Sequence, residues 1–189
     1  MNKERLAAFM DAVLAIIMTI LILELKKPET ATIKALWNLR VDFFAYTLSF
    51  FWLGTMWVNL HNEWHKIKYI TPSIVWVNVV ILFFSSFFPY STAIVSKNFH
   101  NTTAQLFYGI ITIGVTVSVI ITTNTLIEAN KTDKNILEKL KRMNFHLKYD
   151  LIIKIVAFLI SAFFYPPAIM IAILFLTLIF VFLAILKKI

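Results

Sequence analysis

The sequence predicts an all-α, polytopic membrane protein with six transmembrane helices in a single domain, residues 1–189. Composition is the first reason: 60% of the 189 residues are hydrophobic and only 15% are charged, a balance that a soluble globule reaches only by exposing large apolar patches. Long uncharged runs are the second reason, and an uneven distribution of Lys and Arg is the third. The runs are apolar on all sides and do not alternate in polarity, which favours helices over the strands of a membrane barrel.

Each predicted span rests on a largely uncharged stretch of about 20 residues, the length that crosses the hydrocarbon core. The last uncharged stretch, 155–186, holds 32 residues and as one helix would extend about 48 Å, too far for one crossing. Pro166 and Pro167 divide it, because proline removes a backbone donor and clashes with the preceding turn. The predicted spans are 5–25, 43–62, 70–95, 104–127, 149–165 and 167–186.

The first span differs from a secretory signal. Asp11 interrupts its apolar core, and Glu24 and Lys26 follow it in place of small residues. A signal peptide has an uninterrupted apolar core and a small-residue cleavage site. We therefore expect this segment to be retained as a helix.

The basic residues predict the orientation, since cytoplasmic loops of membrane proteins carry an excess of Lys and Arg. With the N-terminus inside, 12 of the 18 basic residues fall on the cytoplasmic side and five on the outer side. The remaining one, Lys154, lies in the fifth span near its cytoplasmic end, where its long stem is expected to snorkel to the interface. Both termini are therefore expected in the cytoplasm.

The sequence lacks the residues that several classes of function require. The net charge of +8 comes mostly from residues spread between apolar runs, so no nucleic-acid partner is expected. No cysteine is present, and no nucleophile has an obvious matching base, so neither an enzyme nor a cofactor is expected. His61 and His65 could share a helical face, but no third ligand is evident and no metal site is expected.

Polar side chains lie at the cytoplasmic ends of the first three predicted spans. Arg5 and Asp11 are in the first span, Trp57 and His61 in the second, and Asn78 in the third. Two interpretations stay open: caps and interfacial anchors without a special role, or a polar network between helices that holds the first one. Arg5 and Asp11 lie about 240° apart around their helix, so Asp11 is expected to bond to a neighbouring helix.

The start of the first span carries a recognisable pattern. Arg5, Phe9, Met10 and Asp11 are followed by an Ile/Leu/Thr helix. This resembles the Arg-x-x-x-Phe-Ser-Asp signature of the transmembrane protein 175 family of potassium channels. Met10 departs from the pattern, because the family usually has Ser there.

Later segments resemble the same family. The second span ends in Trp57-Val-Asn-Leu-His61, and the third contains Asn78 followed by Phe-Phe-Pro-Tyr-Ser-Thr at 87–92. His61 stands four residues after Trp57, where the family more often has His three residues after. The similarity covers about the first half of the chain, and the later spans match only in number and hydropathy.

The resemblance implies a prokaryotic single-repeat channel in the plasma membrane, with potassium ions and the lipid bilayer as partners. Four chains would form a homotetramer whose first helices line a central, weakly selective potassium pore. By position, apolar rings at Ile16, Ile20 and Leu23 would form the constriction, and the hydroxyl of Thr19 would contribute to cation preference. The inter-helix polar network would consist of Arg5, Phe9, Asp11, Trp57, His61 and Asn78.

Helix geometry is compatible with this assignment. Relative to Ile16, the side chains of Ile20, Leu23 and Thr19 lie at about +40°, −20° and −60°, so the four occupy one stripe. An equally apolar face lies opposite, and periodicity alone therefore does not choose between them. That opposite face consists of Leu14, Met18, Leu21 and Leu25.

Two alternatives from other classes remain. A proton-coupled transporter would use Arg5, Asp11 and His61 and would saturate with its substrate. A membrane scaffold or assembly protein would show no flux.

Overall fold

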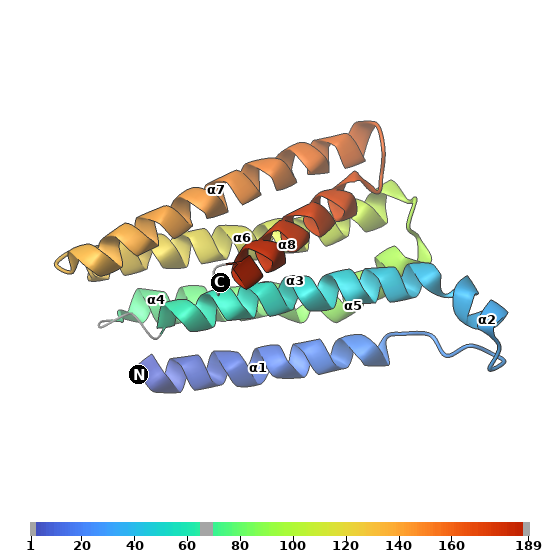
Figure 1. The fold of residues 1–189 in the computed structure, drawn as a ribbon, viewed down its shortest axis with the longest axis horizontal. Helices are drawn as coiled ribbons and strands as arrows, with labels where there is room; N and C mark the ends of the chain where they lie inside the picture. The colour runs from blue at the N-terminus through green and yellow to red at the C-terminus, as the bar shows by residue number, and fades with distance from the viewer. Residues whose placement is uncertain (1–2, 65–69, 187–189) are drawn as a thin grey trace.

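A computed structural model describes residues 3–64 and 70–186 of the chain. These residues form helices and connecting loops, with no strand among them (Figure 1). The all-α prediction is confirmed. The helices are α1 (Lys3–Leu23), α2 (Ile33–Asn38), α3 (Arg40–Trp64), α4 (Pro72–Ser86), α5 (Phe88–Lys97), α6 (Thr102–Ala129), α7 (Lys134–Phe163) and α8 (Ala168–Leu186).

Five stretches of the described chain are long and apolar enough to cross a membrane: Lys3–Leu23, Arg40–Asn62, Pro72–Lys97, Thr102–Ala129 and Ala168–Leu186. Successive long segments run in opposite directions, so α1 begins and α8 ends toward the same end of the bundle (Figure 1). We call this the amino-terminal end. The fifth predicted span, 149–165, falls in the second half of α7 and stays a prediction, as does the cytoplasmic location of this end.

Capping residues explain where several helices begin. The hydroxyl of Thr71 accepts a hydrogen bond from the backbone N–H of Ile74 at 3.4 Å, and Pro72 occupies the first turn of α4. The side chains of Asn101 and Asp133 accept equivalent bonds at the starts of α6 and α7. Each side-chain oxygen satisfies a backbone donor that the first turn of a helix leaves free.

Two elements differ from the predicted spans. The third span is divided at Phe87 into α4 and α5, with Pro89 in the first turn of α5. Residues 128–148 lie between the fourth and fifth predicted spans, but those from Lys134 onward form the first half of α7. Ile136, Leu140, Met143 and Leu147 recur there at helical spacing and pack into the core. At its other end α7 stops at Phe163, before Pro166 and Pro167, and α8 starts at Ala168.

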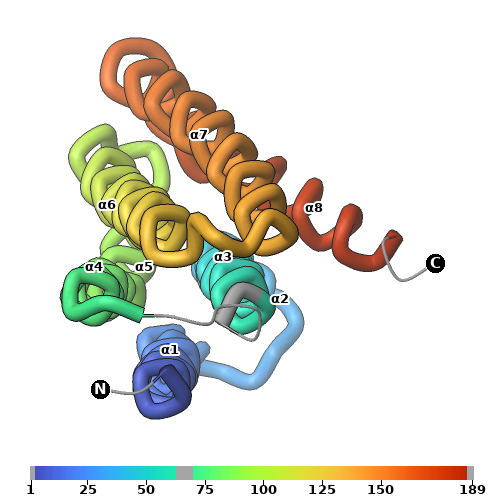
Figure 2. The backbone as a smooth tube through the Cα atoms, turned by 90° about the vertical axis from the view of Figure 1, so that its left-hand side faces the viewer, coloured from blue at the N-terminus to red at the C-terminus, as the bar shows by residue number. Residues whose placement is uncertain are grey.

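Helix α6 contacts α4, α5, α7 and α8 and lies between α4 and α7 on one side of the bundle (Figure 2). Two glycines on α6 permit close approach. A Cβ atom at Gly114 would lie 2.6 Å from ring atoms of Phe84, and one at Gly109 would lie 2.8 Å from Phe158. Small residues at such crossings are typical of helix packing in membranes.

Helix α1 occupies the edge of the bundle, where it packs on α3, α4 and α5 (Figure 2). Helices α7 and α8 meet at the turn after Phe163 and diverge toward the amino-terminal end. Five residues counted or considered in the sequence, His65, Lys66, Lys68, Lys187 and Lys188, lie outside the described residues.

Candidate functional site

The two apolar faces of α1 have different environments. Leu14 and Leu21 are each 1% exposed and pack into the chain's own core, whereas Ile16 is 58% and Leu23 78% exposed. The stripe that was predicted to line a pore therefore faces away from the rest of the chain. Ile20 lies on the same exposed face. We call Ile16, Thr19, Ile20 and Leu23 the α1 stripe.

The hydroxyl of Thr19 donates its proton to the backbone carbonyl of Ile16 at 2.8 Å. A hydroxyl has one donor and two acceptor lone pairs. With the proton used inside the helix, the lone pairs of this exposed oxygen remain for an external partner. Such a partner would be a donor or a cation.

Three residues of the predicted polar network meet at the amino-terminal end of the bundle. Trp57 Nε1 donates to Asp11 Oδ1 at 2.7 Å, and His61 Nδ1 lies 3.9 Å from Asp11 Oδ2. The Trp57 and His61 rings are 5.3 Å apart between centroids. Asp11 thus links α1 to α3, although it remains 42% exposed. We call Asp11, Trp57 and His61 the Asp11 clamp.

The other three predicted network residues are placed differently. Asn78 is fully buried and donates from Nδ2 to the carbonyl of Ile74 at 2.7 Å, while its Oδ1 has no hydrogen-bond partner among the described residues. Arg5 and Phe9 are exposed on α1. Phe9 lies seven residues before Ile16, about 20° from it around the helix, so it extends the α1 stripe toward the amino-terminal end.

Sequence reasoning missed a buried charged cluster on α7. Lys154 is 1% exposed, and its Nζ donates to Asp150 Oδ2 at 2.5 Å and to Thr116 Oγ1 at 2.8 Å. The same ammonium lies 5.0 Å from the centroid of the Trp52 ring, a cation–π distance. We call Asp150, Lys154 and Thr116 the α7 ion pair cluster.

The expectation that Lys154 snorkels to the interface is therefore wrong. The ammonium points into the bundle because a carboxylate four residues earlier on the same face neutralises it there. A buried charge is tolerated when it is paired and hydrogen-bonded. The i, i+4 spacing of Asp150 and Lys154 is the sequence signal that would have indicated this pair.

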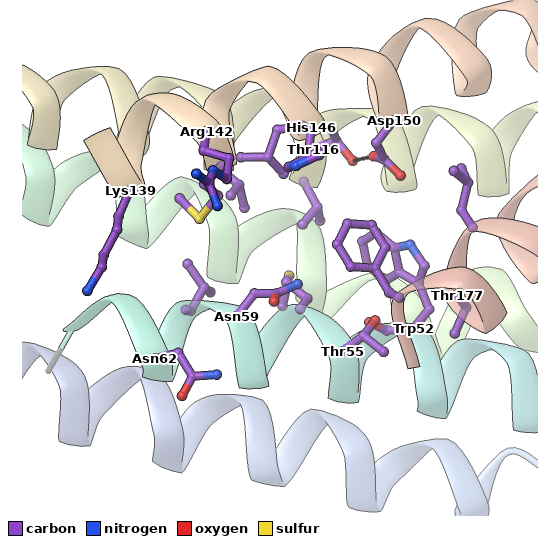
Figure 3. Close-up of a pocket in the computed structure, with 18 of the residues that line it drawn as sticks. Trp52, Thr55, Asn59, Asn62, Thr116, Lys139, Arg142, His146, Asp150 and Thr177 are labelled. Atoms are coloured by element: carbon purple, nitrogen blue, oxygen red, sulfur yellow. Dashed lines mark hydrogen bonds between the residues drawn. The ribbon is translucent and has the colours of Figure 1, made fainter. Parts of the chain in front are cut away.

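A cavity of about 670 Å³ lies between α3, α6, α7 and α8. Figure 3 shows Lys139 and Arg142 of α7 at one end, with Asn59 and Asn62 of α3 across from them. Trp52, Asp150 and Thr177 lie toward the other end. Among the described residues, no group of three His, Cys, Asp or Glu could hold a metal ion.

Comparisons with known proteins agree with one another. The family model described as endosomal/lysosomal potassium channel TMEM175 matches residues 5–89, which contain every predicted site residue. A potassium channel of Chryseobacterium sp. (strain P1-3) is 33% identical over 169 residues, which cover 88% of this chain and 85% of that protein. A potassium channel of Streptomyces collinus (strain DSM 40733 / Tue 365) is 31% identical over 102 residues, covering 51% and 50%.

The fold has a counterpart among solved structures. The crystal structure of a lysosomal potassium-selective channel TMEM175 homolog from Chamaesiphon minutus superposes with a TM-score of 0.84. The match covers 95% of this chain and 96% of that one, at 22% sequence identity. The helical arrangement therefore extends beyond the segment that the family model recognises.

Proposed function

Because the chain belongs to the TMEM175 family of potassium channels, we propose that four copies conduct potassium ions through a central pore lined by the α1 stripe. The observation that carries this proposal is the division of α1 into two faces. Leu14 and Leu21 pack inside the chain, while most of the surface of Ile16 and Leu23 is exposed. Fourfold association around α1 would give these exposed residues partners and would place them at the axis.

The proposed gate is a set of apolar rings. Four copies each of Ile16, Ile20 and Leu23 would narrow the conduit until water leaves it. A cation entering a dry ring loses hydration and finds no replacement oxygens, so the ring blocks ions without a plug. Widening by about the size of one water molecule would restore a hydrated path, so gating would require only a small movement of α1.

Selectivity would come from Thr19 and would be weak. The hydroxyl proton is donated to Ile16, so the lone pairs of four Thr19 oxygens would face the ion one helical turn from the Ile16 ring. Hydroxyls present fewer coordinating dipoles than a stack of backbone carbonyls. Glu24, exposed just after the outer end of α1, would raise the local concentration of cations.

The Asp11 clamp would set the position of α1. In this proposal the Trp57–Asp11 hydrogen bond holds the amino-terminal end of α1 on α3, while apolar contacts hold the remainder. The proton-coupled transporter alternative uses Arg5, Asp11 and His61. The 3.9 Å between His61 Nδ1 and Asp11 Oδ2 is longer than a hydrogen bond, so a relay would require these two groups to move closer.

Recordings of the purified protein in a planar bilayer with unequal K⁺ and Na⁺ test these functions. A channel gives discrete single-channel steps and a reversal potential displaced modestly toward that of K⁺. A transporter gives saturable flux without steps, and a scaffold gives no flux.

The gate is tested by Ile16→Asn, which should raise basal potassium current several-fold because a polar ring stays hydrated. Ile22→Asn is the matched control, since Ile22 is also exposed on α1 but lies about 120° from Ile16 around the helix. Equal currents from the two variants would remove Ile16 from the gate.

A further inference from the structure

The cavity between α3, α6, α7 and α8 is separate from the α1 stripe, and its volume of about 670 Å³ is typical of ligand sites. Its wall on α7 runs from Asn135 to Lys154, a rise of about 28 Å along the helix. The cavity therefore extends from the predicted cytoplasmic interface to the depth of the α7 ion pair cluster.

Basic residues of α7 divide between two faces. Lys139, Arg142 and His146 line the cavity, and their spacing of three and four residues keeps them within about 60° around the helix. Lys141 and Lys148 do not line it and lie about 180–200° from Lys139. Lys139 points across the cavity toward α3 (Figure 3). Glu138 also lies on the rim, so Lys139 and Arg142 together with Glu138 leave a net positive charge of about one unit there.

The deeper part of the cavity is mostly apolar. Its walls include Met56 and Val119, together with Leu176 and Phe180 of α8. The charges at its floor, Asp150 and Lys154, neutralise each other. A ligand that fits a positively charged rim and an apolar interior has an anionic group at one end and a hydrocarbon portion at the other.

The bilayer is a direct source of such a ligand. Helix α8 supplies one wall of the cavity with Leu176 and Phe180, while Phe175 and Leu178 on its other side are exposed to the surroundings of the bundle. Helices α7 and α8 diverge toward the amino-terminal end (Figure 2). Basic pockets between transmembrane helices on the cytoplasmic side favour anionic lipid headgroups.

We propose that this cavity binds an anionic phospholipid of the leaflet at the amino-terminal end, with its phosphate between Lys139 and Arg142 and part of one acyl chain along Leu176 and Phe180. The phosphate accepts charge-assisted hydrogen bonds from the guanidinium and the ammonium. The acyl chain covers apolar wall that water would otherwise occupy. This site does not depend on potassium conduction.

Lipid binding to the purified, delipidated full-length protein tests the proposal by native mass spectrometry during titration. Dioleoyl phosphatidylglycerol should bind about tenfold more tightly than dioleoyl phosphatidylcholine, a difference of about 1.4 kcal/mol. K139A/R142A should lose this preference. K141A/K148A, with the same charge removed from the opposite face of α7, should keep it.

Two further measurements distinguish a lipid headgroup from free phosphate and distinguish lost binding from misfolding. Inorganic phosphate alone should not bind measurably at the concentrations where phosphatidylglycerol saturates; equal affinity would identify a free phosphate as the ligand and overturn the lipid assignment. Leu176→Trp fills the apolar wall and keeps both cations, so it should weaken phosphatidylglycerol binding without changing the helical circular dichroism. A wild-type protein without headgroup preference, or equal losses in the two double variants, would also overturn the proposal.

Discussion

The charged residues of this protein differ in where their hydrogen-bond and ion-pair partners lie. Lys154 is buried against Asp150, Thr116 and the Trp52 ring, while Asp11 receives the indole N–H of Trp57 at a half-exposed site. The two carboxylates therefore have different structural roles. Asp150 compensates a fully buried cation, and Asp11 joins two helices at a site that water reaches.

Removing the cation of the α7 ion pair cluster should destabilise the fold. Lys154→Met leaves Asp150 buried without compensation, so the free energy of unfolding should fall by about 3–5 kcal/mol. Unfolding in a detergent titration, followed by circular dichroism, measures the change. Asp150→Leu combined with Lys154→Met should recover most of the loss, because no uncompensated charge remains.

Lys148→Met serves as the control, since Lys148 is exposed on the opposite face of α7. An equal loss of stability in this control would contradict the assignment of the effect to the buried pair.

At the scale of helices, small residues on α6 let its neighbours approach closely. Gly114 lets α4 bring Phe84 against the α6 backbone, and Gly109 does the same for Phe158 of α7. Gly54 on α3 differs, because a Cβ atom there would meet only the end of Met18 at 3.7 Å. The three glycines of the chain are thus not equivalent.

Gly114→Ala should lower the stability by about 1–3 kcal/mol, because the new methyl group forces the Phe84 ring to move. Gly54→Ala, the matched control, should be neutral or stabilising by up to about 1 kcal/mol, since alanine favours the helix over glycine. The same detergent titration compares them. Equal effects at the two sites would show that the α4–α6 crossing is not tightly packed.

At the scale of the whole molecule, one chain leaves an apolar stripe at its edge. The α1 stripe is exposed while the core of the chain is assembled without it. In the proposed tetramer the pore belongs to no single chain, because each contributes one helix to a common axis. The predicted phospholipid site, in contrast, is contained within one chain.

The absence of cysteine from the sequence allows a direct test of the tetramer. Leu23→Cys introduces one thiol per chain at an exposed position of the stripe, and four such thiols near an axis should be joined by a short bifunctional maleimide in membranes. Cross-linked dimers on a denaturing gel are the expected product. Phe175→Cys on the exposed side of α8 should give none.

A monomeric product from Leu23→Cys, with efficient labelling by a monofunctional maleimide, would contradict association around α1. Cross-linking at Phe175→Cys alone would indicate that the chains meet along α8 instead.

Much of the fold was predictable because hydropathy and proline act locally. The all-helical membrane class and the break at Pro166 and Pro167 follow from backbone constraints that neighbouring elements do not alter. The division at Phe87 and the length of α7 were not predicted. The charged first half of α7 forms a helix because its apolar residues pack into the core. Local composition does not reveal this packing.

The candidate site was predictable only in part. The family resemblance located the α1 stripe, and the residues of the Asp11 clamp were expected to lie at the same depth. Asn78 bonds within its own helix instead. The burial of Lys154 required Thr116 and Trp52, which are 38 and 102 residues away along the chain, and no local pattern brings these groups together.

By itself, then, the amino-acid sequence determined that this protein resides in a membrane, that it is helical, and to which family it belongs, because composition and motif are properties of the chain alone. Only the tertiary structure decided which face of α1 is covered and where the charges of α7 point. Both depend on packing between distant helices, since two equally apolar faces differ only in what lies against them.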